Sequence, residues 1–219
     1  MSLLEFARGP ALEIALGAFA FGVAWRLLSL LALPWSRDRS VARPAAPSAL
    51  AAAAGGFVRR MWPARPFRRS DLWVTLNGHV YHIGLAIVVF GLAQHIQFIK
   101  GLFGLQWPNL PTGLVSLVSV ITLASLTVAL ARRVVSPVLR LISTANDYFS
   151  WLVTALPVAT GLLAQSHLGA RYETLLAWHL LSVALLLAWF PYGKLMHAFL
   201  VFLTRGETAI FYRRRGVQS

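Results

Sequence analysis

The sequence predicts an all-α membrane protein, a bundle of five transmembrane helices with its N-terminus outside and its C-terminus in the cytoplasm. Of 219 residues, 58% are hydrophobic, whereas a soluble domain usually has about 45–50% apolar residues. Several uncharged runs are long enough to cross a bilayer core of about 30 Å. The formal net charge is +13, and the charges flank these runs. Membrane topology and anionic lipid explain them better than nucleic acid, which we do not expect as a partner.

We predict one integral membrane domain over residues 1–219. Its spans are expected at about 11–33, 72–99, 114–130, 148–164 and 174–203. The first span ends at Pro34, and Pro108 and Pro111 mark the turn after the second. Pro157 predicts a kink in the fourth span, and Pro191 lies inside the fifth. Residues 34–70 form a basic linker whose Phe57–Phe67 stretch fits either a membrane-surface segment or a solvated loop.

The distribution of basic residues predicts the orientation. The linker at 34–70 and the segments 132–140 and 205–215 together carry fifteen of the 20 Lys and Arg residues. The opposite side carries only Arg8, Lys100 and Arg171. Because positively charged loops stay in the cytoplasm, the linker and the C-terminus are expected there. We therefore expect a multi-pass protein of the bacterial inner membrane.

The chain has no cysteine. This excludes disulfides, cysteine-ligated iron–sulfur clusters and covalent CxxCH haem attachment. A metal held by this chain needs His, Met or carboxylate ligands. Any iron–sulfur cluster of a larger electron-transfer assembly must therefore lie on another subunit.

Histidines within the predicted spans are the candidate functional residues. His179 and His197 are 18 residues apart in the fifth span. On one continuous helix this spacing returns to the same face about 27 Å further along. Ionisable side chains inside a span suggest function, and imidazole is a common axial ligand of haem iron. We therefore expect a membrane cytochrome b with two haem sites, one above the other.

Helix direction predicts which histidines pair. The second helix runs outward, which places His82 toward its inner end and His95 toward its outer end. The fifth runs inward, so that His179 is outer and His197 inner. Depth therefore pairs His82 with His197 and His95 with His179. His79 is then a neighbour of a ligand or a ligand itself, and His167, in an outer loop, is an interfacial residue.

Two motifs resemble the gamma subunit of respiratory nitrate reductase, the membrane cytochrome b of that family. The first is Tyr81-His82-Ile83-Gly84, followed by Gly91. The second is the spacing from His179 to His197, with Phe190-Pro191-Tyr192 before the second histidine. The likeness extends over the five-span layout. Relatives of that subunit serve other complexes, among them heterodisulfide-reductase-like and sulfite-reductase-associated complexes and some hydrogenases.

The resemblance implies two b haems, each held by one histidine from the second helix and one from the fifth. His82 and His197 would then ligate the inner haem, and His179 the outer one. It further implies a quinol site near the outer haem and a cytoplasmic iron–sulfur subunit as the redox partner. Such a chain transfers electrons and carries no catalytic residues of its own. The sequence leaves the direction of electron transfer open.

The fourth ligand departs from the family pattern. The family histidine lies ten residues after the first motif's histidine, where this chain has Leu92, and the nearest histidine is His95. A shift of three residues moves a side chain about 4.5 Å along a helix and about 60° around it. A distortion near Gly91 could absorb the shift. Because Gly84, Gly91 and His95 share a face, a flat ring is expected to approach there.

For a quinone, the outer end of the second helix offers Gln94, Gly91 and Lys100. A helix simply leaving the bilayer would also carry polar residues there. Two alternatives to the dihaem cytochrome stay open. One is a cytochrome with the inner haem only, and the other is a membrane anchor or transporter without redox function. The inverted repeats that many transporters show are not visible in this sequence.

Overall fold

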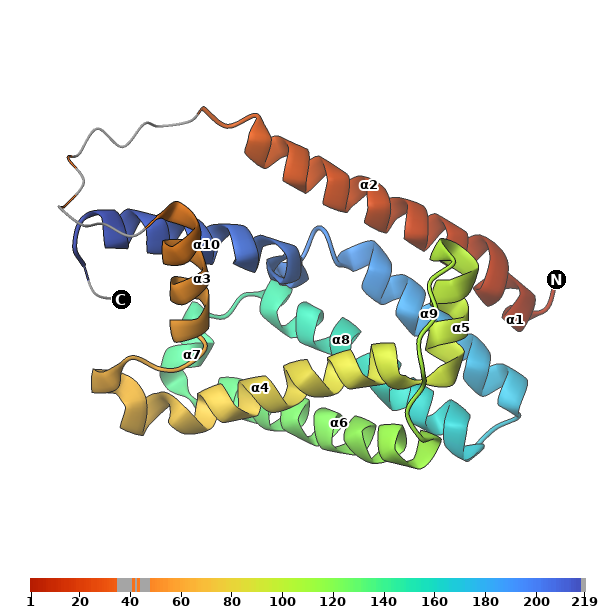
Figure 1. Cartoon of the computed structure of the whole chain (residues 1–219). Helices are drawn as coiled ribbons and strands as arrows, with labels where there is room; N and C mark the ends of the chain where they lie inside the picture. Colours follow the sequence, from red (N-terminus) through yellow and green to blue (C-terminus); the bar gives the residue numbers. More distant parts are fainter. Residues whose placement is uncertain (35–40, 42, 44–47, 218–219) are drawn as a thin grey trace.

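The protein is an all-helical membrane protein, and its computed structural model describes residues 1–34, 41, 43 and 48–217 (Figure 1). Five of its helices are long and apolar enough to cross a membrane, as predicted. They are Leu3–Leu31, Arg65–Gly91, Thr112–Val135, Ala145–Ser166 and Tyr172–Trp189. Residues 35–40, 42 and 44–47 of the predicted basic linker lie outside the described residues.

The third and fourth spans match the predicted ranges closely, whereas the first begins at Leu3 and not near residue 11. The first combines α1 (Leu3–Phe6), a π-helical turn (Ala7–Ala11) and α2 (Leu12–Leu31). The third is α6 (Thr112–Val135), which the short α7 (Pro137–Ile142) follows. The fourth is α8 (Ala145–Ser166), which begins with a capping box between Thr144 and Asp147 and contains Pro157. Long apolar runs favour continuous helices here, since a helix satisfies its own backbone in lipid, and α8 remains helical through Pro157.

The second predicted span, 72–99, is not one helix. Its first part, α4 (Arg68–Gly91), ends at Gly91, and Leu92 takes an extended conformation with φ −79° and ψ 130°. A second helix, α5 (Ala93–Phe103), then starts in a new direction (Figure 1). The chain returns along 104–111, where the Leu110 N–H donates to the Gly91 carbonyl at 2.9 Å.

The fifth predicted span, 174–203, is also interrupted, so the expectation that one helix carries both His179 and His197 is wrong. α9 (Tyr172–Trp189) ends before Pro191, and a turn and a 3-10 segment (Lys194–Met196) follow. α10 (His197–Arg214) then begins at His197 itself. Pro191 provides no N–H to continue the helix. Gly193 packs so closely on the Trp189 indole that a Cβ there would clash.

The described part of the linker contains helical structure where a loop or surface segment was expected. α3 (Ala49–Arg59) packs across α10. The two helices approach at small residues, where Gly56 meets Ala209. Phe57 stacks on Phe202 with ring centroids 5.3 Å apart. A short 3-10 turn (Arg65–Phe67) then leads into α4.

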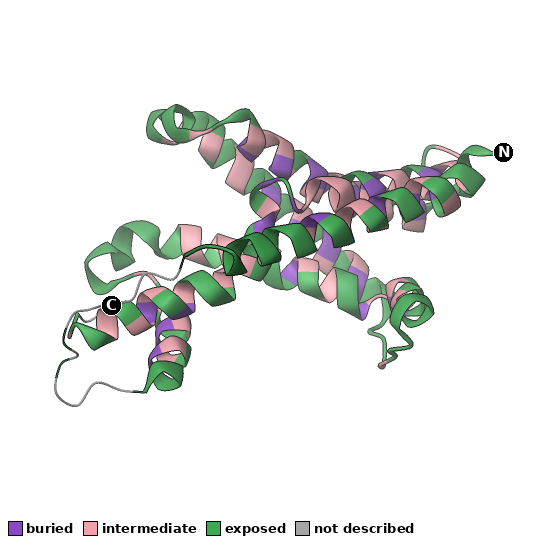
Figure 2. Ribbon diagram, turned by 90° about the horizontal axis from the view of Figure 1, so that it is seen from above, coloured by how far each residue is buried: buried purple, intermediate pink, exposed green. Residues whose placement is uncertain are grey.

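The spans pack in neighbouring pairs. α4 lies against α6, α6 against α8, α8 against α9, and α9 against α2. Buried positions lie where these helices meet, while the outward faces are exposed (Figure 2). Those faces carry large apolar side chains such as Phe21, Leu117 and Leu152. Extensive apolar exposure of this kind is what a lipid-facing surface requires.

Candidate functional site

The structure brings four of the predicted histidines together as two pairs. His82 of α4 lies opposite His197 of α10, with ring centroids 5.9 Å apart and ring planes at 90°. His95 of α5 lies opposite His179 of α9, with centroids 6.1 Å apart and planes at 15°. These are the two pairs predicted from depth. On α4, His82 contacts the Gly78 carbonyl and His95 contacts the Val88 carbonyl. These carbonyls are ten helical residues apart, so the pairs lie about 15 Å apart along the bundle.

The spacing within each pair fits two imidazoles on opposite sides of one metal ion. A metal–imidazole bond of about 2 Å on each side places the ring centres about 6 Å apart. Haem supplies four further ligands from its own ring, so two histidines suffice for its iron. Among the described residues, no group of three or more histidine, cysteine or acidic side chains could hold a metal. The arrangement therefore suits a bis-histidine haem better than a protein-only metal site.

The hydrogen bonds of the four rings leave the same nitrogen available. The Nδ1 atoms of His82 and His197 lie 2.7 Å from the carbonyls of Gly78 and Lys194. Those of His95 and His179 lie 2.9 and 3.1 Å from the carbonyls of Val88 and Pro157. A carbonyl only accepts, so each Nδ1 carries the proton and donates. The lone pair is then on Nε2, and such outer hydrogen bonds orient ligating imidazoles and raise their basicity.

The break at Leu92 is what brings His95 to its partner. The last carbonyls of a helix have no partner within it. Here the Val88 carbonyl accepts from His95, the Phe90 carbonyl accepts from the Trp107 indole at 2.6 Å, and the Gly91 carbonyl accepts from Leu110. His95 lies three residues after the position of the family ligand, Leu92. The break in the helix still brings the His95 ring to His179, as expected of a distortion near Gly91.

A polar network that sequence analysis missed holds the turn before His197. The Asp147 side chain is only 6% exposed, and it pairs with Lys194 Nζ at 2.6 Å and Arg133 Nη1 at 3.0 Å. Asn146 Oδ1 accepts from the Lys194 N–H at 3.2 Å and from the Ser150 hydroxyl at 2.9 Å. Because the Lys194 carbonyl accepts from His197, Asp147 and Asn146 position that ring through Lys194. The only sequence signal was an acid at the start of a span.

The outer pair lies in a polar niche between α8 and α9. Thr160 Oγ1 is 3.4 Å from His179 Nδ1 and 2.9 Å from Ser182 Oγ. A Cβ on Gly161 would lie 3.1 Å from the His179 ring, so glycine leaves room for the imidazole. Pro157, expected to kink α8, supplies the carbonyl that receives the His179 proton.

The two remaining histidines face no second histidine. His79 stacks on Trp62 with ring centroids 5.6 Å apart, and its Nδ1 is 2.7 Å from the Thr75 carbonyl. His167, at the left-handed C-terminus of α8, stacks on Tyr172 at 5.1 Å. His79 therefore packs on Trp62 and not on a second histidine, and His167 is a helix-end residue.

The glycines do not leave an open face on the second helix. A Cβ on Gly84 would clash with the Thr122 side chain of α6, and one on Gly91 would meet Leu110 at 2.9 Å. Gly91 is buried against that returning segment, which covers the face where a flat ring was expected to approach, and its contact with a quinone stays a prediction. Gln94 and Lys100 are exposed on α5. In the described part of the chain, neither is hydrogen-bonded to a histidine of the two pairs.

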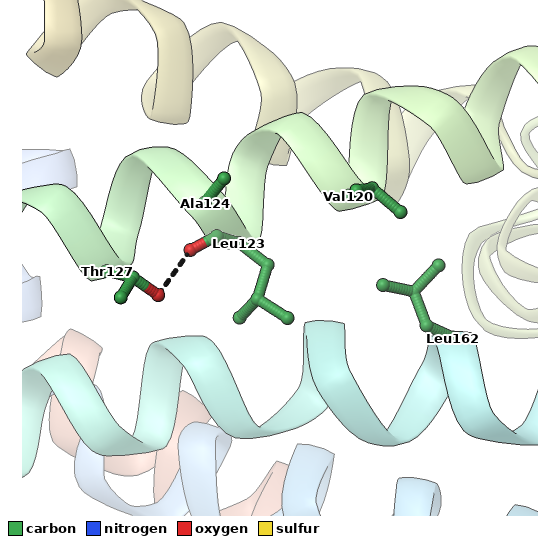
Figure 3. A pocket seen from close by; sticks show the side chains of 5 residues that line it. All are labelled: Val120, Leu123, Ala124, Thr127 and Leu162. Carbon is green, nitrogen blue, oxygen red and sulfur yellow. Dashed lines mark hydrogen bonds between the residues drawn. The ribbon is translucent and has the colours of Figure 1, made fainter.

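The spaces between the helices include two open cavities. One of about 430 Å³ between α6 and α8 is lined by Val120, Leu123, Ala124, Thr127 and Leu162 (Figure 3). It contains no titratable group, and its Thr127 hydroxyl is already bonded to the Leu123 carbonyl. The other, of about 670 Å³, lies beside His197 and is lined by Arg26, Lys194 and Arg205. Of these two cavities, the second adjoins a histidine pair.

Comparison with known proteins relates this chain to another protein along most of its length. A protein of Nitratidesulfovibrio vulgaris is 30% identical to this chain over 212 residues, which cover 96% of this chain and 93% of the relative. Its name states no activity. No protein-family model matches the chain.

Proposed function

We propose that this chain, which belongs to the same family as the Nitratidesulfovibrio vulgaris protein, is a dihaem cytochrome b that transfers electrons across the bacterial inner membrane. His82 and His197 would hold the inner haem, and His95 and His179 the outer one. When bound, each haem would carry one electron at a time. With both axial positions filled by imidazole, neither iron would bind oxygen.

The observation that supports this proposal most strongly is the pairing of four histidines from four helices. Both pairs have the ring separation of a bis-imidazole metal site, 5.9 and 6.1 Å. All four rings also have Nδ1 beside a backbone carbonyl, which leaves Nε2 for a metal. A membrane anchor without cofactor would have no need of either feature.

We further propose that the chain exchanges electrons between the quinone pool and a cytoplasmic iron–sulfur subunit, as its resemblance to the nitrate reductase gamma subunit implies. The outer pair is close to the end of the bundle where α5 and the 104–111 segment lie. Of the candidate quinone contacts Gln94, Gly91 and Lys100, Gln94 and Lys100 are exposed on α5. The inner pair lies toward the end that carries the basic segments, which we place in the cytoplasm.

The test is the number of haems per chain, measured by pyridine haemochrome assay on the purified protein. We expect two haems, and one after His95→Ala or His179→Ala, which remove an outer ligand. His82→Ala and His197→Ala should each remove the inner haem. His79→Phe is the matched control, because it keeps an aromatic ring against Trp62 and should retain both haems.

The counts also separate the alternatives. One haem in the parent chain, unaffected by His95→Ala, would reduce the protein to a cytochrome with an inner site only. A colourless parent chain would leave a membrane anchor or transporter and would refute the cytochrome.

A further inference from the structure

Arg26 is a charged residue within the first transmembrane helix, and its position has no explanation in the fold. Its side chain is exposed on α2 and lines the cavity beside His197. Among the described residues, both ion pairs are made by Asp147, and Arg26 takes part in neither. An arginine inside a span is costly without a partner and therefore suggests a function.

The cavity that Arg26 lines is cationic. Lys194 and Arg205 also line it, and no acidic side chain of the described residues does. Lys194 is paired with Asp147. Arg205 is held by the Arg60 carbonyl at 3.2 Å and lies over the Phe57 ring. Three separate segments thus contribute cationic residues to the lining of one cavity, and among the described residues no ion pair balances Arg26.

The other lining residues indicate what carries that anion. His197 borders the cavity, together with the apolar side chains of Met196, Leu200 and Val201. The occupant therefore combines an acidic group with an apolar body that reaches the histidine. Guanidinium is well suited to such a group, because it binds a carboxylate through two parallel hydrogen bonds.

We propose that this cavity binds the carboxylate side chains of the haem held by His82 and His197, and that Arg26 is their main cationic partner. This inference rests on the proposed function. It makes the first helix part of the inner site, although that helix carries no histidine. The rival occupant is an anionic phospholipid, whose head groups bind basic pockets between helices on the cytoplasmic side.

The experiment measures haem affinity at the inner site alone. The full chain with His179→Ala is produced without haem and titrated in detergent with haem and with haem dimethyl ester, which lacks free carboxylates. We expect haem to bind about tenfold more tightly than the ester, the size of one charge-assisted hydrogen bond. Arg26→Leu should remove this preference by weakening haem binding alone, and Arg26→Lys should keep part of it.

Arg8→Leu is the matched control, because Arg8 is an exposed arginine of the same span that does not line the cavity. It should leave the preference unchanged. Equal binding of haem and ester by the His179→Ala chain with Arg26 intact would overturn the inference. This comparison does not depend on the folding of any Arg26 variant. If Arg26→Leu instead loses co-purified anionic phospholipid while its haem preference stays intact, the occupant is lipid. Failure of the parent chain to bind either compound refutes the proposed function itself.

Discussion

At the residue scale, the ring angles distinguish the two pairs. The His82 and His197 planes are perpendicular, whereas those of His95 and His179 are nearly parallel. Perpendicular imidazoles leave two iron d orbitals nearly equal in energy, which increases the anisotropy of a low-spin ferric signal. Electron paramagnetic resonance of the oxidised protein should therefore show two low-spin signals. The more anisotropic one should disappear in His197→Ala and persist in His95→Ala, and two identical signals would contradict the ring geometry.

Asp147 provides a second prediction at this scale. Asp147→Asn keeps the shape of the side chain but removes the charge that Lys194 and Arg133 share. Both cations are partly exposed, so we expect a loss of about 1–3 kcal/mol in the free energy of unfolding. Because Lys194 orients the His197 ring, the signal of the inner haem should also broaden. Thermal unfolding and the resonance spectrum measure the two effects.

Asn146→Ala tests the same network at its uncharged member. It removes only the acceptor for the Lys194 N–H and the Ser150 hydroxyl. A spectral change in this variant with nearly unchanged thermal stability would show that positioning of His197 is separable from stability. An unchanged inner signal in both variants would mean that the network serves the fold alone.

The sequence predicted the histidine pairs but not the network beside them. Depth in the bilayer follows from span boundaries and orientation, and this sufficed to match His82 with His197 and His95 with His179. Which cations a single acid contacts depends on the packing of distant helices. Asp147 meets Lys194 across 47 positions of sequence and Arg133 across 14, and no local pattern contains that information.

At the element scale, the sequence predicted which segments are helical better than where those helices are interrupted. α2, α6 and α8 followed from long apolar runs. No proline marks the break at Leu92. A glycine such as Gly91 is equally compatible with close helix packing and with the end of a helix. Pro191 was visible but does not by itself reveal that α9 ends there, since lipid-embedded helices tolerate proline when neighbouring groups satisfy the backbone. At the Leu92 break, donors from side chains and from the 104–111 segment form hydrogen bonds with the last carbonyls of α4.

The contact between α4 and α6 yields the third prediction. Gly84 lies two residues after His82 on α4, and a Cβ on Gly84 would clash with Thr122. Gly84→Ala should therefore push α4 from α6 and cost about 1–3 kcal/mol in the free energy of unfolding through overpacking. The displaced helix should also carry His82 away from His197. The checks are thermal unfolding in detergent and the content of the inner haem.

Gly113→Ala is the control for this prediction, because a Cβ on Gly113 of α6 would meet nothing within 4 Å. Alanine favours helix over glycine, so this variant should be as stable as the parent or more stable by up to about 1 kcal/mol. Equal effects of the two substitutions would show that the close approach at Gly84 does not matter.

At the scale of the whole molecule, the fold gathers the basic segments at one end. The start of α4, the end of α6 and the end of α10 lie toward one end of the bundle, and the N-terminus and the α8–α9 turn toward the other (Figure 1). Since most of the described basic residues belong to the segments at the first end, we predict that this end is cytoplasmic. Electrons that enter at the outer pair would then leave toward a partner in the cytoplasm.

The absence of cysteine makes this orientation directly measurable, because a single introduced thiol has no background. Ser166→Cys is exposed at the α8–α9 turn, and Ser70→Cys is exposed at the start of α4. In intact cells a membrane-impermeant maleimide should label the first variant and not the second. Ser70→Cys should react only after permeabilisation, which serves as its own control for thiol accessibility. The reverse pattern would place the inner histidine pair on the outside and exclude a cytoplasmic partner at His82 and His197.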